Sequence, residues 1–322
     1  MNPTEKLDKI TEEIDEIIGI THIKSILNEQ NLKIYWGTTP GRLPNILYLI
    51  PLMTLHHFIQ CGCEVKVLLA DIHAYLDSIK SNFDVLKART NIHEKIINLL
   101  LGRMNIETSQ IEFVQGMTYQ LRNEFTLDLY RINSFCSVSQ VKNAGKDAVV
   151  QESDPKMTSL LYPTLQALDI EYLDCDVFFG DLKQKEICKF TNQILEKLGY
   201  RKRGFFLNEI YEELNCFKSI TFIDTYAQIE DKIKNIKLNV LIEFIDVIIF
   251  DFSEISGIEF IINNIRINSI DEIKEFYKNK EIRNDDIRKS VVDFIDSINE
   301  SIREEYSNDD SIGLLKEAHY IS

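Results

Sequence analysis

The sequence predicts an α/β fold with a parallel sheet, followed by a mainly helical region. The first sign is a short apolar run at 32–36, a loop with two glycines, a helical pattern over 44–60 and a second apolar run at 64–70. Strand, loop, helix and strand in this order form the repeating unit of a parallel sheet. The second sign is that three more short apolar runs alternate with helical patterns up to residue 207. The third is that apolar residues recur with helical spacing from residue 229 onward.

The amino-terminal part of the chain is expected to contain two helices and two strands. Residues 3–29 are expected to form one amphipathic helix, because Leu7, Ile10 and Ile14 begin an apolar stripe that continues to Ile18, opposite acidic side chains. We expect a buried strand over Leu32–Trp36, a helix over Pro44–Gln60 and a strand over Glu64–Ala70.

The alternation continues through the middle of the chain. We expect helices over 86–101, 122–135, 161–173 and 182–198, the last ended by Gly199, and strands over 111–114, 175–179 and 204–207. The polar stretch 137–154 is expected to connect elements beside the sheet. In the carboxyl-terminal part, residues 285–306 give the clearest helical pattern.

The composition is globular and excludes several classes of function. The 322 residues are 44% hydrophobic and carry a net charge of −15, which opposes a polyanionic partner over the surface as a whole. The amino end lacks the apolar run of a secretory signal, and the best membrane candidate, Leu238–Phe250, is too short and contains Glu243 and Asp246. Six scattered cysteines lack zinc-site spacing. We therefore expect free thiols, no structural metal, no membrane partner and a cytoplasmic location.

The stretch Leu161–Gln184 carries the most informative polar residues. Tyr162, Gln166 and Asp169 are spaced i, i+4 and i+7, which puts all three on one face of a helix. A phenolic hydroxyl, an amide and a carboxylate on one face are typical of a recognition pocket. A solvated helix face would have the same spacing, so the pattern alone leaves both interpretations open.

Several longer stretches match a known family. They are KIYWGT (Lys33–Thr38), CEVKVLLADIHAYLD (Cys63–Asp77), YQLRNEFTLDLYR (Tyr119–Arg131), KNAG (Lys142–Gly145), LLYPTLQALDIEYL (Leu160–Leu173) and LGYRKR (Leu198–Arg203). Together they resemble the tyrosyl-tRNA synthetases of the eukaryotic and archaeal branch, firmly over about residues 30–210.

The resemblance implies an architecture and a set of partners. A class I, Rossmann-type catalytic domain would span residues 1–220, with a connective insertion at about 120–160, and a helical anticodon-binding-like domain would span 221–322. Such enzymes activate L-tyrosine with ATP and Mg²⁺ and transfer it to tRNA(Tyr), and a homodimer is expected.

The tyrosine-binding residues of the family carry over to this chain. By the resemblance, Tyr35 and Asp169 would bind the phenol, and Tyr162, Gln166 and Gln184 would hold the ammonium group. A buried carboxylate that needs a phenolic proton is left unpaired by phenylalanine, which favours rejection of that amino acid. His73, which follows a predicted strand, is either a ligand-side residue or a packed histidine.

The ATP-binding signatures of the family do not carry over. The HIGH-type motif falls on Asn45-Ile46-Leu47-Tyr48, with Asn45 in place of the histidine and Leu47 in place of the glycine. After the 175–179 strand, Gly180-Asp181-Leu182-Lys183-Gln184 replaces Gly-Gly-x-Asp-Gln. A leucine side chain would occupy the space that adenine needs, and Asp181 would stand where the family has its second glycine.

The later nucleotide elements are also altered. The adenine loop of the family falls on Tyr211–Leu214, which contributes Glu212 and Glu213. The first lysine of the KMSKS motif falls on Lys218, and the hydroxyl-rich remainder is missing. Carboxylates near a nucleotide are repulsive, so most elements that hold adenine, ribose and phosphates are degenerate.

The tRNA-contacting positions are less clear. By the resemblance, Lys142 falls where the family contacts the acceptor stem, and Arg283 and Asp286 fall near the anticodon site. Each could equally be a solvated surface residue, as could the basic run Arg201-Lys202-Arg203. Acids outnumber bases over 285–306, so this helix is not a simple phosphate track.

Three functions remain open from the sequence. The first is a tyrosine-binding pseudo-synthetase with weak or absent adenylation, which the missing phosphate donors favour. The second is an active tyrosine–tRNA ligase with altered signatures. The third is a non-catalytic interaction module in which tyrosine binding is vestigial.

Overall fold

The computed structural model describes residues 3–77, 82–148 and 154–321, which form two compact units. Unit 1 comprises the chain up to Gly41, His57–Asn91 and Ser109–Ile210, and unit 2 comprises Arg42–His56, Ile92–Thr108 and the chain from Tyr211 onward. Residues 149–153 of the predicted connective segment lie outside the described residues. The assignment of a catalytic and an anticodon-binding domain stays a prediction.

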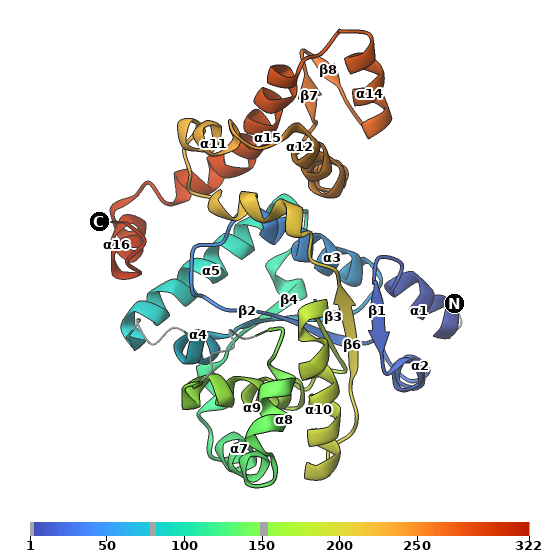
Figure 1. The fold of residues 1–322 in the computed structure, drawn as a ribbon, viewed down its shortest axis with the longest axis vertical. Helices are drawn as coiled ribbons and strands as arrows, with labels where there is room; N and C mark the ends of the chain where they lie inside the picture. The colour runs from blue at the N-terminus through green and yellow to red at the C-terminus, as the bar shows by residue number, and fades with distance from the viewer. Residues whose placement is uncertain (1–2, 78–81, 149–153, 322) are drawn as a thin grey trace. The chain divides into compact units, whose positions relative to one another are not determined.

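Unit 1 is built on a six-stranded sheet (Figure 1). Its strands are β1 (Glu16–Ile18), β2 (Lys33–Thr38), β3 (Glu64–Leu69), β4 (Ile111–Gln115), β5 (Val177–Asp181) and β6 (Gly204–Asn208). The spatial order is β1-β6-β5-β2-β3-β4, with β2 to β6 parallel and β1 antiparallel to β6. The predicted parallel sheet is confirmed. Because the strand order reverses between β2 and β5, a ligand crevice is expected beyond their carboxyl ends.

The prediction of one helix over residues 3–29 is wrong. The segment forms α1 (Pro3–Ile10), β1 and α2 (Ile20–Leu27). Ile17 and Ile18, counted in the apolar stripe, pair with Phe206 and Phe205 of β6 instead. Gly19 follows β1 with a left-handed φ of +84°, and a Cβ there would lie 3.0 Å from the carbonyl oxygen of Arg203. The chain therefore turns at the one residue type that tolerates both constraints.

Unit 1 contains the helices that carry the predicted pocket. They are α4 (Asp71–Asp77), α6 (Met117–Gln120), α7 (Asn123–Phe135), α8 (Val138–Ala144), α9 (Met157–Tyr172), the 3-10 turn η3 (Leu182–Gln184) and α10 (Lys185–Leu198). Helix α9 packs against α4, α7, α8 and α10 (Figure 1), and every residue from Pro163 to Ile170 except Gln166 is buried. Gly199 ends α10 in a left-handed conformation, as predicted. The stretch predicted only to connect elements contains α8, which Ser137 and Gln140 cap.

Unit 2 is mainly helical, as predicted. From Tyr211 onward it contains η4 (Glu212–Ser219), α11 (Tyr226–Ile233), α12 (Leu238–Phe244), the π-helical turn η5 (Ile245–Ile249), α13 (Phe250–Ser256), the hairpin β7 (Ile261–Ile262) and β8 (Ile265–Arg266), α14 (Ile270–Lys278), α15 (Asn284–Glu305) and α16 (Asp309–Glu317). Helix α15 is its central element and packs against α11 and α12 (Figure 1). The turn η1 (Ile46–Tyr48) also belongs to this unit. Helices α3 (Leu49–Gln60) and α5 (Phe83–Arg103) contribute residues to both units. Helix α3 begins at Leu49, later than the predicted start at residue 44.

Two general properties concern only the described part of the chain. None of its helices is long and apolar enough to cross a bilayer. Within the same residues, no group of three or more His, Cys, Asp or Glu side chains could hold a metal ion.

Candidate ligand-binding site

The centre of the candidate site is the buried carboxylate of Asp169 on α9. Asp169 is 1% exposed. Its Oδ1 accepts a hydrogen bond from the Tyr119 hydroxyl at 2.7 Å and another from Gln120 Nε2 at 2.7 Å. Its Oδ2 lies 3.5 Å from Nε2 of His73, at the amino end of α4. The carboxylate is thus held by side chains from α6 and faced by one from α4.

Burial dominates the electrostatics of this group. It raises the pKa of Asp169 to about 7, against the opposing effect of the hydrogen bonds from Tyr119 and Gln120. It also lowers the pKa of His73 to about 3, so the imidazole is neutral at physiological pH. Asp71, at the start of α4, is buried too and its pKa is raised by burial, while its Oδ1 accepts from the backbone amides of Ile72 and Met117. His73 and Asp169 therefore do not form an imidazolium–carboxylate ion pair at physiological pH.

Tyr35 lies on β2, beside β5, and is 2% exposed. Its ring packs against Phe178 with the ring centroids 5.0 Å apart. Burial raises the pKa of Tyr35 well above its usual value, and the nearby Asp169 carboxylate adds to this effect. The two residues that the resemblance assigns to the phenol are therefore electrostatic neighbours in a water-poor part of unit 1.

The residues assigned to the ammonium group lie on α9 and η3. Gln166 donates a hydrogen bond from Nε2 to Gln184 Oε1 at 3.0 Å, and Gln184 Nε2 lies 3.5 Å from Asp181 Oδ2. Tyr162, one turn before Gln166, presents its ring edge-to-face to His73, with the ring centroids 4.7 Å apart. The predicted shared face of Tyr162, Gln166 and Asp169 is confirmed for the first and the last, because both meet His73.

Gly180 is required by packing at the end of β5. A Cβ at this position would lie 2.4 Å from the Phe178 ring and 3.1 Å from Gln184 Oε1. The glycine therefore leaves room both for the aromatic ring that packs against Tyr35 and for the amide that pairs with Gln166.

Three polar residues of this site were not assigned from the sequence: Tyr119, Gln120 and Asp71. Tyr119 and Gln120 open the matching stretch YQLRNEFTLDLYR, and Asp71 lies in CEVKVLLADIHAYLD. Their place in stretches that match the family was the only sequence feature that pointed to them. It did not reveal which side chains turn toward Asp169, because α6 spans only Met117–Gln120 and is too short for a helical period.

The HIGH-type position lies in unit 2. Asn45 caps η1, with its Oδ1 accepting a hydrogen bond from the Leu47 amide at 3.1 Å. Its backbone forms an antiparallel bridge with Thr221, and the Ile46 amide donates to the Ile220 carbonyl oxygen at 2.9 Å. Tyr48 is half-buried, with its ring centroid 6.2 Å from that of His93. The Asn45 carboxamide oxygen is thus committed to its own helix.

The KMSKS-type position lies just before Ile220 and Thr221, which form these backbone contacts with Asn45 and Ile46. Lys218 is exposed at the end of η4, where Glu212 and Glu213 are exposed as well. Just beyond it, the Thr221 amide donates to Asp224 Oδ2 at 2.7 Å, and the same oxygen pairs with Lys232 Nζ at 2.6 Å. The segment after Lys218 is therefore fixed by backbone and side-chain hydrogen bonds.

Asp181 introduces a negative group at a nucleotide-signature position. Burial raises its pKa, while hydrogen bonds from the Lys183 and Gln184 amides oppose this effect. Its Oδ1 is inaccessible and has no hydrogen-bond partner among the described residues. A carboxyl group in this environment would repel a polyphosphate when it ionises.

The predicted tRNA residues have structural contacts of their own. Lys142 is half-buried in the last turn of α8, in unit 1. In unit 2, the Arg283 amide donates to Asp286 Oδ2 at 2.8 Å, and the Arg283 guanidinium lies 3.4 Å from the same oxygen. The backbone hydrogen bond lowers the pKa of Asp286. Asp286 thus caps α15, and its role toward tRNA stays a prediction.

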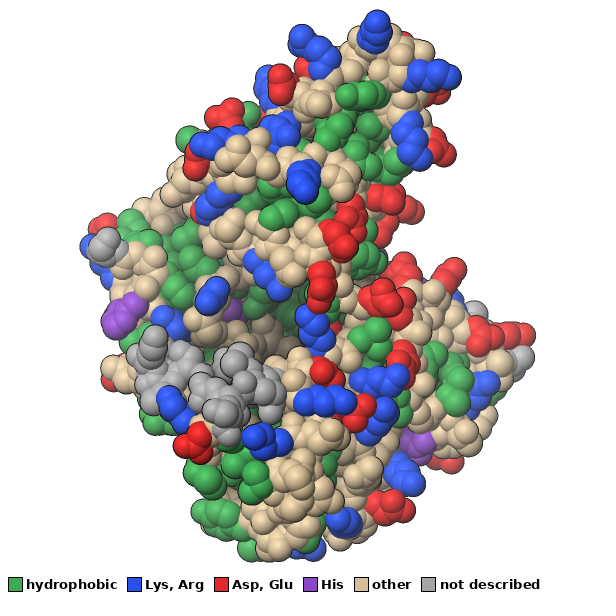
Figure 2. All heavy atoms as spheres, in the orientation of Figure 1, with side chains coloured by type: hydrophobic (Ala, Val, Ile, Leu, Met, Phe, Trp, Pro, Cys, Tyr) green, Lys and Arg blue, Asp and Glu red, His purple; other side chains and the backbone are tan. Residues whose placement is uncertain are grey.

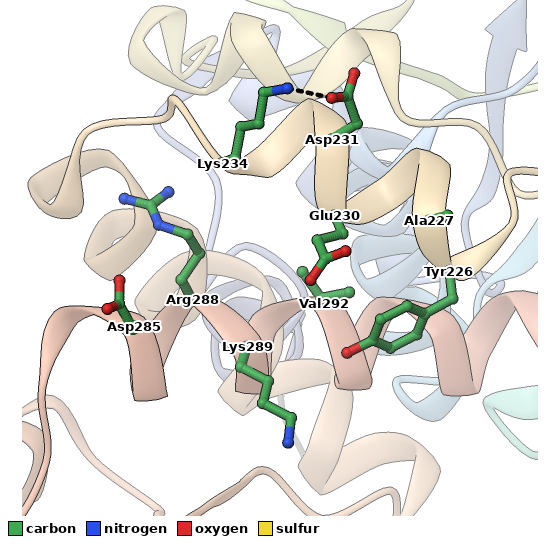
Figure 3. A pocket seen from close by; sticks show the side chains of 9 residues that line it. All are labelled: Tyr226, Ala227, Glu230, Asp231, Lys234, Asp285, Arg288, Lys289 and Val292. Carbon is green, nitrogen blue, oxygen red and sulfur yellow. Dashed lines mark hydrogen bonds and ion pairs between the residues drawn. The ribbon is translucent and has the colours of Figure 1, made fainter.

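A groove of about 650 Å³ between α11 and α15 lies in the same unit (Figure 3). Its charged lining residues are three bases and three acids: Lys234, Arg288, Lys289, Glu230, Asp231 and Asp285. Figure 3 shows Lys234 paired with Asp231, and Arg288 also donates to the Ile233 carbonyl oxygen at 2.6 Å. This balance agrees with the expectation that α15 is not a continuous phosphate track.

The basic run Arg201-Lys202-Arg203 is largely structural. Arg203 is 2% exposed, pairs with Glu171 and donates to the Cys175 carbonyl oxygen at 2.8 Å. Arg201 donates to the fully buried Asp176 at 2.9 Å. Lys202 is exposed and lies 3.6 Å from Glu196, so all three cations have an acidic partner within unit 1.

Several tyrosine–tRNA ligases are similar to the chain in sequence. It is 33% identical to a probable cytoplasmic tyrosine–tRNA ligase of Vairimorpha ceranae, over 96% of this chain and 97% of that protein. It is 31% identical to the cytoplasmic tyrosine–tRNA ligase of Saccharomyces cerevisiae, over 99% and 89%. Against the corresponding ligase of Xenopus tropicalis, also 31% identical, the chain spans 64% of the length of that relative.

Solved structures share the fold. A tyrosyl-tRNA synthetase of Pyrococcus horikoshii complexed with L-tyrosine superposes with a TM-score of 0.82 at 14% identity, covering both chains fully. The L-tyrosine complex of the Archaeoglobus fulgidus synthetase gives 0.79 at 22% identity, over 94% of this chain and 99% of that one. The family model for tRNA synthetases class I (W and Y) matches residues 27–299. The chain therefore belongs to the class I tRNA synthetases for tryptophan and tyrosine, and within them it is of the tyrosyl type.

Proposed function

We propose that this protein binds L-tyrosine in unit 1 and has weak or absent adenylation activity. The observation that carries the proposal is the buried carboxylate of Asp169, placed close to Tyr35 and on the helix that also bears Tyr162 and Gln166. A carboxylate deprived of water gains most from a ligand that donates a hydrogen bond to it. A phenolic hydroxyl supplies such a donor, and the benzyl ring of tyrosine suits the aromatic surroundings of Tyr35 and Phe178.

The nucleotide side supports the second half of the proposal. The residues at the ATP positions do not fit a nucleotide and its Mg²⁺ well. The Asn45 oxygen is used as a helix cap, Leu47 adds a side chain, and Asp181 adds a carboxyl group. Phosphoryl chemistry depends on donors placed in advance around the developing charge, and these substitutions remove or oppose such donors.

The fixed segment after Lys218 adds a further argument. The family signature at this place is rich in hydroxyl side chains, whereas here Ile220 and Thr221 pair with Asn45 and Ile46 through their backbones. Asp224 then closes the turn. A segment held in this way supplies fewer free donors to a phosphate.

The second candidate is an active tyrosine–tRNA ligase. The relatives favour it, because the proteins of Vairimorpha ceranae and Saccharomyces cerevisiae that match over most of their length carry that name. It requires ATP with Mg²⁺ and tRNA(Tyr), with Lys142, Arg283 and Asp286 as candidate tRNA contacts. The remaining alternative is an interaction module that binds no tyrosine.

We also propose a homodimer through the connective segment. The predicted connective segment, which contains α7, carries several exposed apolar side chains, and Figure 2 shows hydrophobic side chains at the lower edge of this view. The exposed apolar residues of the segment are Leu121, Leu127, Tyr130, Phe135, Val138 and Met157. Patches of this kind mark protein interfaces. Leu127→Glu should shift the mass measured by light scattering from dimer to monomer, whereas Ile261→Glu, a control at an exposed apolar residue of unit 2, should not. A monomeric unmodified protein would refute the dimer.

Two assays separate the three candidates. Calorimetric titration with L-tyrosine should show binding that Asp169→Ala abolishes and Tyr35→Phe weakens, whereas Tyr277→Phe, which removes an exposed hydroxyl of unit 2, should leave it unchanged. Tyrosine-dependent ATP–pyrophosphate exchange should stay at background. Exchange clearly above background would refute the loss of adenylation and favour the ligase, and the absence of tyrosine binding would leave only the interaction module.

A further inference from the structure

The two oxygens of Asp169 have unequal surroundings. Oδ1 accepts two short hydrogen bonds, from the Tyr119 hydroxyl and from Gln120 Nε2, each at 2.7 Å. Oδ2 faces His73 Nε2 across a longer distance of 3.5 Å. A carboxylate oxygen with two strong donors is close to saturated, so the remaining accepting capacity of Asp169 is concentrated on Oδ2.

Gln120 sets the direction of the His73 ring proton. Gln120 Nε2 carries two hydrogens, and besides Asp169 Oδ1 it lies 3.5 Å from His73 Nδ1 and 3.4 Å from the Tyr119 hydroxyl. If Nδ1 faces a donor, the proton of the neutral imidazole belongs on Nε2, the atom that faces Asp169 Oδ2. His73 and Gln120 therefore form a pair of neutral donors on two sides of one carboxylate.

The packing around His73 keeps the ring in this orientation. His73 is 2% exposed, and its ring meets the Tyr162 ring edge-to-face with the centroids 4.7 Å apart. Its Nε2 is buried and forms no hydrogen bond with the described residues, since Asp169 Oδ2 is 3.5 Å away. A buried donor in that state is costly, and the cost is relieved by a small movement of the carboxylate or by a ligand oxygen that lies within hydrogen-bond reach of both groups.

We propose that His73 and Gln120 are positioning residues for phenol recognition. They hold Asp169 with Oδ1 saturated, so that Oδ2 is the oxygen presented to the hydroxyl of the ligand, and the His73 Nε2 donor is available to the same hydroxyl oxygen. The phenol then donates to Asp169 and accepts from His73. This inference rests on the proposed binding of L-tyrosine and deepens it, because it names the groups that orient the carboxylate.

Two substitutions of His73 separate donation from packing. His73→Phe keeps a ring against Tyr162 but removes the donor, whereas His73→Gln keeps an amide donor near the Nε2 position but removes the ring. We expect His73→Phe to weaken L-tyrosine binding roughly tenfold or more, because it leaves the buried phenol oxygen of the ligand without this donor. We expect His73→Gln to remain within about threefold of the unmodified protein, a small loss on the same scale. If His73→Phe binds tyrosine as well as His73→Gln or better, packing is the role of this residue and the inference is overturned.

The measurement is calorimetric titration of the full chain with L-tyrosine, with the folding of each variant checked by circular dichroism. His22→Phe is the matched control, since it replaces another unit 1 histidine, on α2, that lies near Arg201 and Arg203 rather than Asp169. It should leave the affinity unchanged. If both His73 variants fail to fold, Gln120→Met decides: a clear loss of affinity supports the inference, and unchanged affinity overturns it. Absence of binding by the unmodified protein would instead refute the proposed function itself.

Discussion

Replacing Asp169 by asparagine should stabilise unit 1, and more so at higher pH. The side chain is 1% exposed, and burial raises its pKa from 3.8 to about 7. An acid whose pKa is higher in the folded than in the unfolded state costs stability as it ionises. The cost is absent below pH 3.8, grows as the pH rises, and is complete above about pH 7. Asparagine carries no charge and can still accept from Tyr119 and Gln120 through its Oδ1.

The magnitude follows from the two pKa values. At about 1.36 kcal/mol for each pH unit, the difference between 3.8 and about 7 corresponds to ~4 kcal/mol at about pH 8. At about pH 5.5 most of the folded protein still carries the proton, and the cost is ~2 kcal/mol. The gain in unfolding free energy from Asp169→Asn should therefore increase by ~2 kcal/mol between these two pH values. A constant effect of the substitution on packing cancels in this difference.

The assay is urea denaturation at both pH values, followed by tryptophan fluorescence. The single tryptophan of the chain, Trp36, lies on β2 and reports on unit 1. Asp174→Asn is the control, because a hydrogen bond from Lys33 lowers the pKa of that exposed carboxylate. Its substitution should change stability little, and in the opposite direction. A gain for Asp169→Asn that is the same at both pH values, or smaller at the higher one, would refute the reasoning.

Three other perturbations have defined outcomes. The affinity for L-tyrosine should fall roughly tenfold between about pH 8 and about pH 6 in calorimetry, because the phenol needs an ionised Asp169, whose pKa is about 7. Gly180→Ala should weaken tyrosine binding and cost about 1–3 kcal/mol of stability, because its Cβ would lie 2.4 Å from the Phe178 ring. Arg203→Met should cost about 3–5 kcal/mol in urea denaturation, because it leaves Glu171 without its buried partner. Adding Glu171→Leu should recover most of that loss.

Each of these expectations has a clear contrary result. A tyrosine affinity that does not change with pH would mean that Asp169 is ionised throughout the range or does not contact the ligand. Unchanged stability of Gly180→Ala would mean that the Phe178 ring can move aside. A double variant no more stable than Arg203→Met would show that Arg203 acts through its other contact, the Cys175 carbonyl oxygen.

The sequence predicted the parts of the fold that depend on local pattern. The parallel strands and α9 follow from short apolar runs and from the spacing of Tyr162, Gln166 and Asp169. The three-residue strand β1 could not be predicted, because its pairing partner β6 is distant in the chain and its isoleucines also fit a helical stripe. Hydrophobic periodicity is a local property, and β1 is defined by a non-local one.

The residues of the candidate site also fall into those predictable from local pattern and those that depend on tertiary packing. The residues named from the sequence lie on regular elements, where position along a helix or strand fixes direction. Tyr119 and Gln120 lie on a four-residue helix, and their direction toward Asp169 comes from tertiary packing. The buried pairing of Arg203 with Glu171 was missed for a similar reason, since a run of three cations is usually solvated.

The pairing of β1 with β6 has a consequence for synthesis of the chain. Glu16 pairs with Leu207, so β1 has no partner until almost two hundred further residues have been made, on the order of ten or more seconds of translation. Until then β5 also lacks its neighbour β6, and an apolar parallel edge is open to association with other chains. Glu12, Glu13 and Asp15 precede β1 and Glu16 begins it, so this segment stays charged while its partner strand is missing. We expect that unit 1 completes its sheet in one late step, once Asn208 has emerged.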